Sequence, residues 1–163
     1  MYKRQSPDKT VFIDTWSRVD LTPRHALRRV SDGKLLCELE TADAKDLYAT
    51  GWRHAERFVA KDRDGKFDIH GIICRPSNFD PKKKYPVVEV IYAGPHGSFV
   101  PKGWRSRYGH WRDELMELGF ITVQIDGKGT NHRGREFQHF AYKNINDAGF
   151  PDRIKCCLLY TSD

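Results

Sequence analysis

Two apolar, β-branched runs constrain the fold of this chain more than any other feature of its sequence. The runs are PVVEVIY, over residues 86–92, and FITVQI, over residues 120–125. Each stops at glycine-rich sequence, AGPHG after the first run and DGKGT after the second. Short β-branched runs that end at glycine predict two buried strands, each followed by a loop.

The segment between the two runs has the periodicity of an α-helix. Its apolar residues recur at spacings of four and three, which predicts a helix with one stripe on the sheet, and Gly119 predicts the end of that helix. The stripe consists of Trp104, Tyr108, Trp111, Leu115 and Leu118. Strand, helix and strand make a βαβ unit, in which the loops after the strands usually carry the chemistry. We therefore expect the functional loops at residues 92–103 and 126–134.

Three segments of this region carry a family resemblance. They are FDPKKKYPVVEVIYAGP, GFITVQIDGKGT and KNINDAGFPDRI. Together they resemble the start of the α/β-hydrolase domain in the prolyl oligopeptidase family of serine peptidases, and in particular its dipeptidyl peptidase IV-like branch. Upstream, TVFIDTWSRVDLTPRHALRRVSDGKLLCELE resembles the last β-propeller blade that precedes the hydrolase domain in that family.

The resemblance implies a fold class and a domain division. The fold is expected to be α/β, the N-terminal part of an α/β-hydrolase domain preceded by the last blade of a β-propeller, with both domains truncated. Residues 6–42 are expected to end the propeller, and residues 43–155 to form a linker helix and the first portion of the peptidase domain. In this division Asp43 is the expected N-cap of the linker helix.

The IYAGP motif places Tyr92 at a position that has a role in that family. The resemblance implies that its hydroxyl donates to the oxyanion of the tetrahedral intermediate, beside a backbone N–H that follows the nucleophile. A preorganised donor of this kind is worth roughly 10²- to 10³-fold in rate. The alternative is a strand-end aromatic that only packs. The intact motif favours the oxyanion role, so Tyr92 is the catalytic residue predicted for this chain.

The catalytic triad of such an enzyme is not predicted within this sequence. An α/β-hydrolase presents its serine on a Gly-x-Ser-x-Gly elbow, followed along the chain by the acid and the histidine. The serines that lack this context are Ser6, Ser17, Ser31, Ser77, Ser98, Ser106 and Ser162. In the family the elbow lies downstream of the DRI segment. No triad role is therefore predicted for His96, His110, His132 and His139.

The chain is accordingly interpreted as a fragment of a dipeptidyl peptidase-like serine peptidase, which hydrolyses peptide bonds through an acyl-enzyme. The fragment itself is expected to be inactive. Two alternatives stay open for the parent: an esterase or acylaminoacyl-releasing peptidase of the same fold, and a non-catalytic scaffold or binding protein that retained it. Peptides or oligopeptides are the expected substrates. A homodimeric parent and a periplasmic or secreted location are also open.

The two ends of the chain share a possible encoding. Residues 2–5 can be encoded by TAT AAG AGA CAG, whose reverse complement, read one base in, encodes Cys157, Leu158, Leu159 and the start of Tyr160. This string resembles a transposase end sequence used to prepare sequencing libraries. We therefore expect residues 1–5 and 156–163 to be adapter-derived, the alternative being coincidence between two short degenerate strings.

The charge balance argues against a nucleic-acid partner. The chain has 28 Lys and Arg against 22 Asp and Glu, a net charge of +6, and its one basic run, Lys82–Lys84, lies between two prolines. A nucleic-acid interface would gather basic residues with aromatics on one face, whereas a short charged run usually faces water. No apolar run approaches the length of a membrane span.

Two groups of potential metal ligands have better explanations. Asp62, Asp64 and Asp68 surround the Asp64-Gly65 pair, but they lack the glycine and glutamate spacing of a calcium loop, so a tight hairpin turn is predicted. A second such turn is predicted at residues 32–33. His132, Glu136 and His139 would share a helix face only if Gly134 did not interrupt it. Cys37 and Cys74 have no metal-ligand spacing. No metal or cofactor is therefore predicted.

Overall fold

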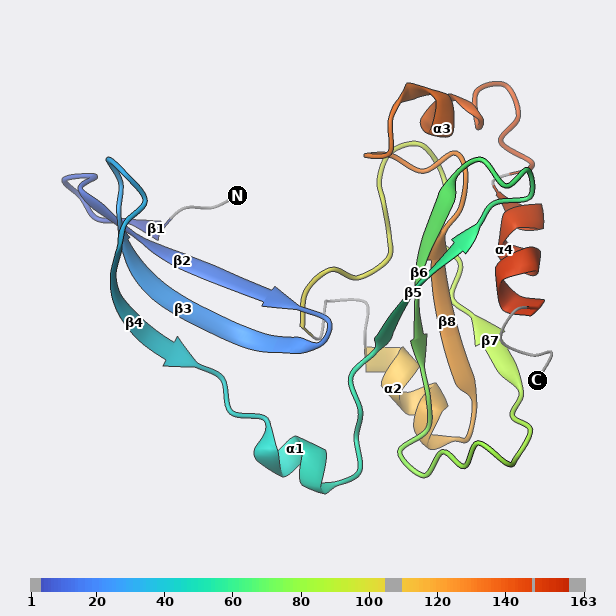
Figure 1. Ribbon diagram of the computed structural model, residues 1–163, viewed down its shortest axis with the longest axis horizontal. Helices are drawn as coiled ribbons and strands as arrows, with labels where there is room; N and C mark the ends of the chain where they lie inside the picture. Colours follow the sequence, from blue (N-terminus) through green and yellow to red (C-terminus); the bar gives the residue numbers. More distant parts are fainter. Residues whose placement is uncertain (1–3, 105–109, 148, 159–163) are drawn as a thin grey trace.

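The computed structural model describes residues 4–104, 110–147 and 149–158, with residues 110 and 111 described by their backbone alone. The chain forms two four-stranded sheets joined by a short helix (Figure 1). The first sheet is an antiparallel meander in which each strand pairs with the next. Its strands are β1 (Arg4–Gln5), β2 (Val11–Arg18), β3 (Leu21–Arg29) and β4 (Leu35–Thr41).

The second sheet is mixed and has the strand order β5-β6-β8-β7. Its strands are β5 (Glu56–Lys61), β6 (Asp68–Cys74), β7 (Val87–Glu89) and β8 (Ile121–Asp126). The pairs β5–β6 and β6–β8 are antiparallel, whereas β7 and β8 are parallel. A parallel pair needs a crossover connection, and helix α2 (His110–Glu117) lies within the segment that joins β7 to β8. The predicted βαβ unit is therefore confirmed.

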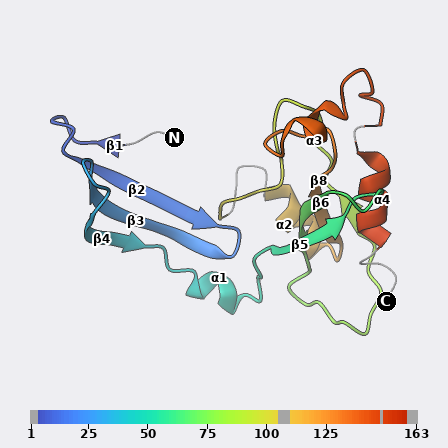
Figure 2. The same cartoon turned by 45° about the horizontal axis from the view of Figure 1, so that its top comes forward.

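The remaining helices are short and lie at the periphery. Helix α1 (Lys45–Ala49) links the two sheets, as the turned view in Figure 2 shows. Helix α3 (Arg135–His139) follows the loop after β8, and α4 (Phe150–Leu158) packs beside the second sheet. No described helix combines the length and apolar character needed to cross a membrane.

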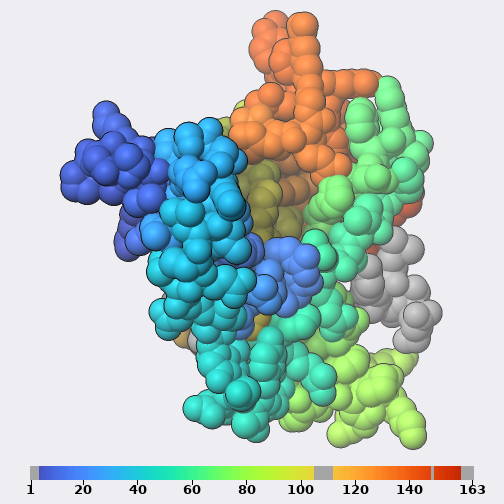
Figure 3. Space-filling view, turned by 60° about the vertical axis from the view of Figure 1, so that its left-hand side comes forward, coloured from blue at the N-terminus to red at the C-terminus, as the bar shows by residue number. Residues whose placement is uncertain are grey.

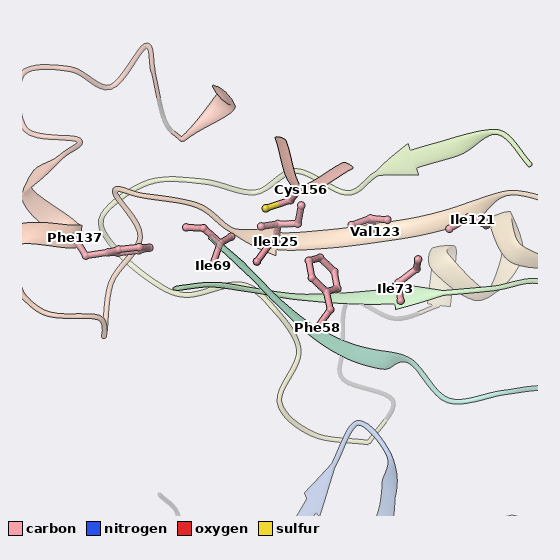
Figure 4. Packing of buried hydrophobic residues seen from close by; sticks show 9 residues of the cluster. Phe58, Ile69, Ile73, Ile121, Val123, Ile125, Phe137 and Cys156 are labelled. Carbon is pink, nitrogen blue, oxygen red and sulfur yellow. The ribbon is translucent and has the colours of Figure 1, made fainter. Parts of the chain in front are cut away.

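The core of the molecule belongs to the second sheet. One face of this sheet packs against α4 in a cluster shown in Figure 4. The cluster contains Phe58, Ala60, Ile69, Ile73, Ile121, Val123, Ile125, Phe137 and Cys156. The other face buries Ile72 and Cys74 under Met116 of α2. Strand β8 is buried along its whole length because it is covered on both faces, which explains the unbroken apolar character of FITVQI.

The first β-branched run forms a shorter strand than its sequence suggests. Strand β7 ends at Glu89, and only the N–H of Val90 continues the ladder, with a hydrogen bond of 2.8 Å to the Val123 carbonyl. Ile91 and Tyr92 are exposed and lie beyond the sheet. The strand therefore ends three residues before Tyr92, and Tyr92 lies in the loop that was expected at residues 92–103.

The apolar stripe predicted for the helix between the two runs is partly wrong. Trp104 precedes α2, and its ring packs against Tyr48 and Trp52 of the linker, with ring centroids 6.2 and 5.4 Å away. Leu118 is 74% exposed, whereas Arg112 and Met116, four residues apart, are the buried members of the helix. The side chains of Tyr108 and Trp111 lie outside the described residues. Trp104, which packs on the linker, therefore matched the helical repeat without belonging to the helix.

Gly119 ends α2 as predicted. It has a φ of 92°, and its N–H donates to the Met116 carbonyl while the N–H of Phe120 donates to the Leu115 carbonyl. These two hydrogen bonds define a Schellman motif, whose left-handed position favours glycine. The stop places Phe120 directly before β8.

Both hairpin predictions are confirmed. Gly33 joins β3 to β4 and Gly65 joins β5 to β6, and both have positive φ. The linker helix begins one residue later than expected, because Ala44 is its N-cap. Asp43 still accepts a hydrogen bond of 2.9 Å from the Lys45 N–H.

Part of each end of the chain lies within these elements. Residues 4–5 form β1, and Cys156 is buried within α4. Residues 1–3 and 159–163 of the segments that we expect to be adapter-derived lie outside the described residues. The adapter interpretation stays a prediction.

Candidate active site

Tyr92 lies in the loop that follows β7, on the surface of the molecule. Its side chain is 58% exposed. The ring packs edge-on against His96 and Phe99, with centroids 5.6 and 4.6 Å away, and His96 and Phe99 also contact each other at 5.2 Å. Three rings in mutual edge-to-face contact hold one another in defined orientations. The Tyr92 hydroxyl is therefore presented to solvent from an aromatic platform.

The carboxyl end of β8 holds the loop that carries this platform. The carboxylate of Asp126 accepts hydrogen bonds from the N–H groups of Phe99 and Val100, at 2.7 and 3.2 Å. The side-chain amide of Gln124 donates to the Phe99 carbonyl at 2.9 Å. Both side chains are buried.

The loop after β8 makes further contacts with the Tyr92 loop. The N–H of Asn131 donates to the Gly97 carbonyl at 2.9 Å. From the following helix α3, the side chain of Gln138 donates to the Pro95 carbonyl at 2.8 Å. The two loops that the βαβ pattern singled out, residues 92–103 and 126–134, are therefore neighbours in space, as the pattern predicts.

The glycines of the DGKGT segment allow close packing beneath these loops. Gly129 has a φ of 95°, and a Cβ on it would lie 2.9 Å from the Cβ of Ala141. A Cβ on Gly127 would lie 3.3 Å from the Gly149 carbonyl oxygen. The segment after α3 thus packs directly on the backbone of residues 127–129, which no larger residue at Gly129 would permit.

Lys128, at the centre of DGKGT, is buried in an acidic pocket. Its ammonium lies 2.6 Å from Asp64, 3.0 Å from Asp62 and 4.0 Å from Asp152. The amine also lies 4.6 Å from the centroid of the Phe140 ring. Burial alone would lower the pKa of the Lys128 amine, but the bonds to Asp64 and Asp62 outweigh it and raise that pKa.

Asp62, the partner of Lys128 in this ion pair, is fully buried. Burial favours its neutral form, but hydrogen bonds from Lys128 and from the N–H groups of Phe67 and Lys66 hold the pKa of the carboxyl below its usual value. Lys128 thus pairs with two of the three carboxylates for which a calcium ion was considered from the sequence, and the third, Asp68, pairs with Lys61. Sequence reasoning missed the Lys128–Asp62 pair because its members come from two loops more than sixty residues apart.

A second ion network ties α4 to the same hairpin. Arg63 makes two hydrogen bonds of 2.7 Å to Asp147 and one of 3.0 Å to Asp152. Asp147 and Asp152 raise the pKa of the Arg63 guanidinium, and Arg63 lowers the pKa of Asp147. The β5–β6 turn, the DGKGT loop and the start of α4 are therefore joined by charged contacts.

A cleft lies between the first sheet and the loops of the second. Figure 3 shows a hollow between the blue and cyan first sheet and the green strands of the second, with the olive loop at its floor. Its charged lining residues include Arg18, Asp20, Arg57, Lys102 and Asp126. His70 also lines the cleft, and burial together with the nearby charge of Arg133 lowers its pKa.

Comparisons with known proteins now bear on this arrangement. The sequence pattern of the Prolyl oligopeptidase family matches residues 107–162. A probable dipeptidyl-aminopeptidase B of Sclerotinia sclerotiorum is 32% identical over 96 residues, which are 59% of this chain and 10% of that protein. Human dipeptidyl peptidase 8 is 36% identical over 78 residues, which are 47% of this chain and 9% of that protein.

Solved structures agree with the sequence matches. A putative dipeptidyl aminopeptidase IV from Bacteroides ovatus superposes with a TM-score of 0.84 and 28% identity, over 99% of this chain and 23% of that one. The chain is similar in sequence and in fold to members of the prolyl oligopeptidase family. Dipeptidyl peptidase 4 of Porphyromonas gingivalis superposes with a TM-score of 0.73 and 25% identity, over 94% of this chain and 22% of that one. The relatives named here are all dipeptidyl peptidases or dipeptidyl aminopeptidases by name. It spans about a tenth of the length of the curated relatives.

Several serines of the chain make side-chain contacts among the described residues. Ser6 contacts Asp8, Ser17 contacts the Trp104 N–H, Ser77 contacts Glu117 and Ser98 contacts Lys102. None of these partners is a histidine. Ser106, Ser162 and the side chain of His110 lie outside the described residues.

Two of the remaining histidines considered from the sequence pack on tyrosine rings. His96 packs on Tyr92, and His139 packs on Tyr142. His132 has a φ of 67° in the loop before Gly134, and α3 begins only after that glycine, as the sequence indicates. Among the described residues, no group of three or more His, Cys, Asp or Glu side chains is arranged to hold a metal ion.

Proposed function

We propose that this chain is part of a dipeptidyl peptidase-like serine peptidase and that Tyr92 contributes to its oxyanion site. In this proposal β2–β4 form the last propeller blade, within residues 6–42, and residues 43–155 form the linker helix and the first portion of the α/β-hydrolase domain. The triad serine, acid and histidine belong to the rest of the protein, which we call the whole peptidase. Its substrates are peptides with a scissile amide bond.

The position of Tyr92 is the observation that carries this proposal. Tyr92 follows a strand that pairs in parallel with β8, so it stands at the carboxyl edge of the sheet, where α/β folds gather their chemistry. Its side chain is exposed and held by two neighbouring rings. A fixed, solvent-facing phenol at this edge can reach a substrate carbonyl.

The chemistry assigns one role to this phenol. A serine nucleophile attacks the peptide carbonyl and forms a tetrahedral intermediate whose oxygen carries negative charge. The Tyr92 O–H donates to that oxygen, and the intermediate collapses to an acyl-enzyme with loss of the amine. Water then hydrolyses the acyl-enzyme through a second such intermediate. Because charge develops on the oxygen during the attack, the hydrogen bond strengthens in the transition state.

Replacement of Tyr92 by phenylalanine tests this role in the whole peptidase. The substitution removes one hydroxyl and keeps the ring that packs on His96 and Phe99. We expect kcat to fall by roughly 10²- to 10³-fold with little change in KM or in Tm. Tyr142→Phe is a matched control, because Tyr142 is also exposed and should leave kcat unchanged. A Tyr92→Phe variant with near-normal kcat would show that Tyr92 is structural.

The 163-residue chain by itself should not hydrolyse peptides. None of its serines stands in a nucleophile elbow. Incubation of the purified chain with a fluorophosphonate probe should therefore give no stoichiometric label, and X-Pro and X-Ala dipeptide substrates should not be cleaved. Stoichiometric labelling of a serine would contradict the proposal and would point to a different nucleophile.

The same assays separate the alternatives within the fold. An esterase or an acylaminoacyl-releasing peptidase would show the Tyr92 effect on a different substrate class, namely esters or N-acylated peptides. A scaffold protein would show no turnover of any of them and no covalent label, even in the whole protein. The names of the relatives favour peptide substrates from which the enzyme releases a dipeptide.

A further inference from the structure

Two side chains of β8 hold both backbone polar groups of one residue in the Tyr92 loop. Gln124 and Asp126 lie two positions apart on the strand, so they project from the same face of the sheet. Asp126 accepts from the Phe99 N–H at 2.7 Å, and Gln124 donates to the Phe99 carbonyl at 2.9 Å. The two side chains are 5% and 3% exposed. Phe99 is therefore fixed from the sheet through its main chain.

Phe99 is the ring closest to Tyr92 in the aromatic platform. The Phe99 and Tyr92 centroids lie 4.6 Å apart, against 5.6 Å for His96 and Tyr92. Tyr92 itself lies two residues past Val90, where the backbone ladder of the sheet ends. Beyond that point, the described contacts of the Tyr92 ring are with His96 and Phe99. The orientation of Tyr92 therefore depends on where Phe99 is held.

The charge of Asp126 makes this hold strong. An ionised carboxylate that accepts two backbone N–H bonds is bound more tightly than a neutral acceptor would be. The second bond, 3.2 Å from the Val100 N–H, extends the hold to the next residue. Because Asp126 and Gln124 lie in an inner strand of the sheet, they connect the sheet to a loop that is partly exposed.

We propose that Gln124 and Asp126 are positioning residues that set the Tyr92 hydroxyl at the oxyanion site by holding the backbone of Phe99. The inference rests on the function proposed for Tyr92. Neither side chain touches the substrate in this scheme. A displacement of about 1 Å at a catalytic group can cost up to about 10²-fold in rate, so the loss of either contact acts on kcat through Tyr92.

A double-mutant cycle in the whole peptidase tests the connection. Asp126→Ala and Gln124→Leu should each lower kcat by roughly 10- to 10²-fold with a small change in KM. In a Tyr92→Phe background, where the hydroxyl is already absent, each should lower kcat by less than about threefold. Asp126→Asn keeps an acceptor oxygen and should recover part of the loss. If Asp126→Ala and Gln124→Leu lowered kcat by the same factor in the Tyr92→Phe background as in the wild type, the proposal would be overturned.

Asp147→Ala is the control for a general loss of stability. Asp147 is a partly buried carboxylate that pairs with Arg63 and has no contact with the Tyr92 loop among the described residues. Its effect on kcat should be the same with and without the Tyr92 hydroxyl. A cycle for Asp147 as strongly coupled as that for Asp126 would also overturn the proposal, because the coupling would then reflect stability alone.

A spectroscopic measurement separates positioning from the proposed function. Fluorotyrosine placed at position 92 should give one fluorine NMR resonance, which shifts or broadens in Asp126→Ala and Gln124→Leu but not in Asp147→Ala. An unchanged resonance in both variants would overturn the positioning role. If kcat were normal in Tyr92→Phe but the resonance changed in Asp126→Ala and Gln124→Leu, the oxyanion role of Tyr92 would be refuted. The positioning of its ring by Gln124 and Asp126 would still be supported.

Discussion

The two sheets of this chain differ in how much of themselves they bury. Within and around β1–β4, the described apolar residues that are buried are Val19 and Ala26, and β4 is exposed along its whole length. The β5–β8 sheet buries apolar residues on both of its faces. Folding requires apolar burial to offset the loss of chain entropy. The second sheet is therefore the stable unit, and both candidate functional loops rest on it.

Two polar contacts among the described residues join the β2–β3 hairpin to the part of the chain that follows the linker helix. Asp20 lies 3.6 Å from Arg57, and the Ser17 hydroxyl accepts a hydrogen bond of 3.1 Å from the Trp104 N–H. An exposed ion pair such as Asp20–Arg57 contributes about 0–1 kcal/mol. The first sheet consequently gains little from the second, and we expect its amides to exchange with solvent first.

The largest expected difference between the two sheets concerns their ion pairs. Lys128→Met leaves Asp62 buried without its partner, and it should lower the free energy of unfolding of this chain by about 3–5 kcal/mol. Arg29→Met breaks the exposed pair with Asp32 in the first sheet and should cost about 0–1 kcal/mol. Urea unfolding, with hydrogen exchange at β8 and β3, measures both.

A second variant keeps the Lys128 prediction open to refutation. Removal of both charges, in Lys128→Met with Asp62→Asn, should recover part of the loss, because no unpaired buried charge remains. Equal losses for Lys128→Met and Arg29→Met would show that burial does not distinguish the two sheets.

Apolar truncation should show the next largest difference. Ile69 is fully buried in the cluster that packs on α4, so Ile69→Ala should cost about 2–5 kcal/mol. Leu39 is exposed on β4, and Leu39→Ala should change the free energy of unfolding by about 0.5 kcal/mol or less. Denaturation midpoints of the two variants give the comparison. A large loss from Leu39→Ala would mean that the first sheet has a core of its own.

The second sheet also shows how much the sequence could predict. FITVQI was predicted correctly as β8 because both faces of that strand are covered, so every position is buried. The hairpin at Asp64-Gly65 and the stop at Gly119 follow from local backbone conformation. These features depend on neighbours in sequence, and a pattern of residue types is enough to predict them.

The candidate site was less predictable for a physical reason. Tyr92 could be placed by a family resemblance, but its contact with Phe99, and the hold of Gln124 and Asp126 on that residue, depend on how two loops meet in space. The strand period does put Gln124 and Asp126 on one face. It does not reveal that their partner lies about twenty-five residues upstream in a loop.

Gly71 has no room for a side chain, and this offers a finer test of packing in the second sheet. A Cβ at this position of β6 would lie 2.3 Å from the Phe58 ring and 3.0 Å from the Gln124 carbonyl oxygen. Gly71→Ala should therefore displace the ring and cost about 1–3 kcal/mol. In the double variant that combines Phe58→Val with Gly71→Ala, the smaller valine side chain should remove the clash. Gly71→Ala should then cost less stability than it does in the presence of Phe58.

The matched glycine of the first sheet should give the smallest effect. Gly33 has a φ of 71° in the β3–β4 turn, and a Cβ there would meet no atom within 4 Å. Gly33→Ala would thus carry only the backbone strain of a left-handed residue, about 1 kcal/mol. Gly33→Asn should be milder, because asparagine tolerates this conformation. The order of loss should be Gly71→Ala, Gly33→Ala and Gly33→Asn, measured as shifts in the urea midpoint. If Gly33→Ala proved the most damaging of the three, the first sheet would depend on its turn more than the second depends on its core, and the contrast between the two sheets would be wrong.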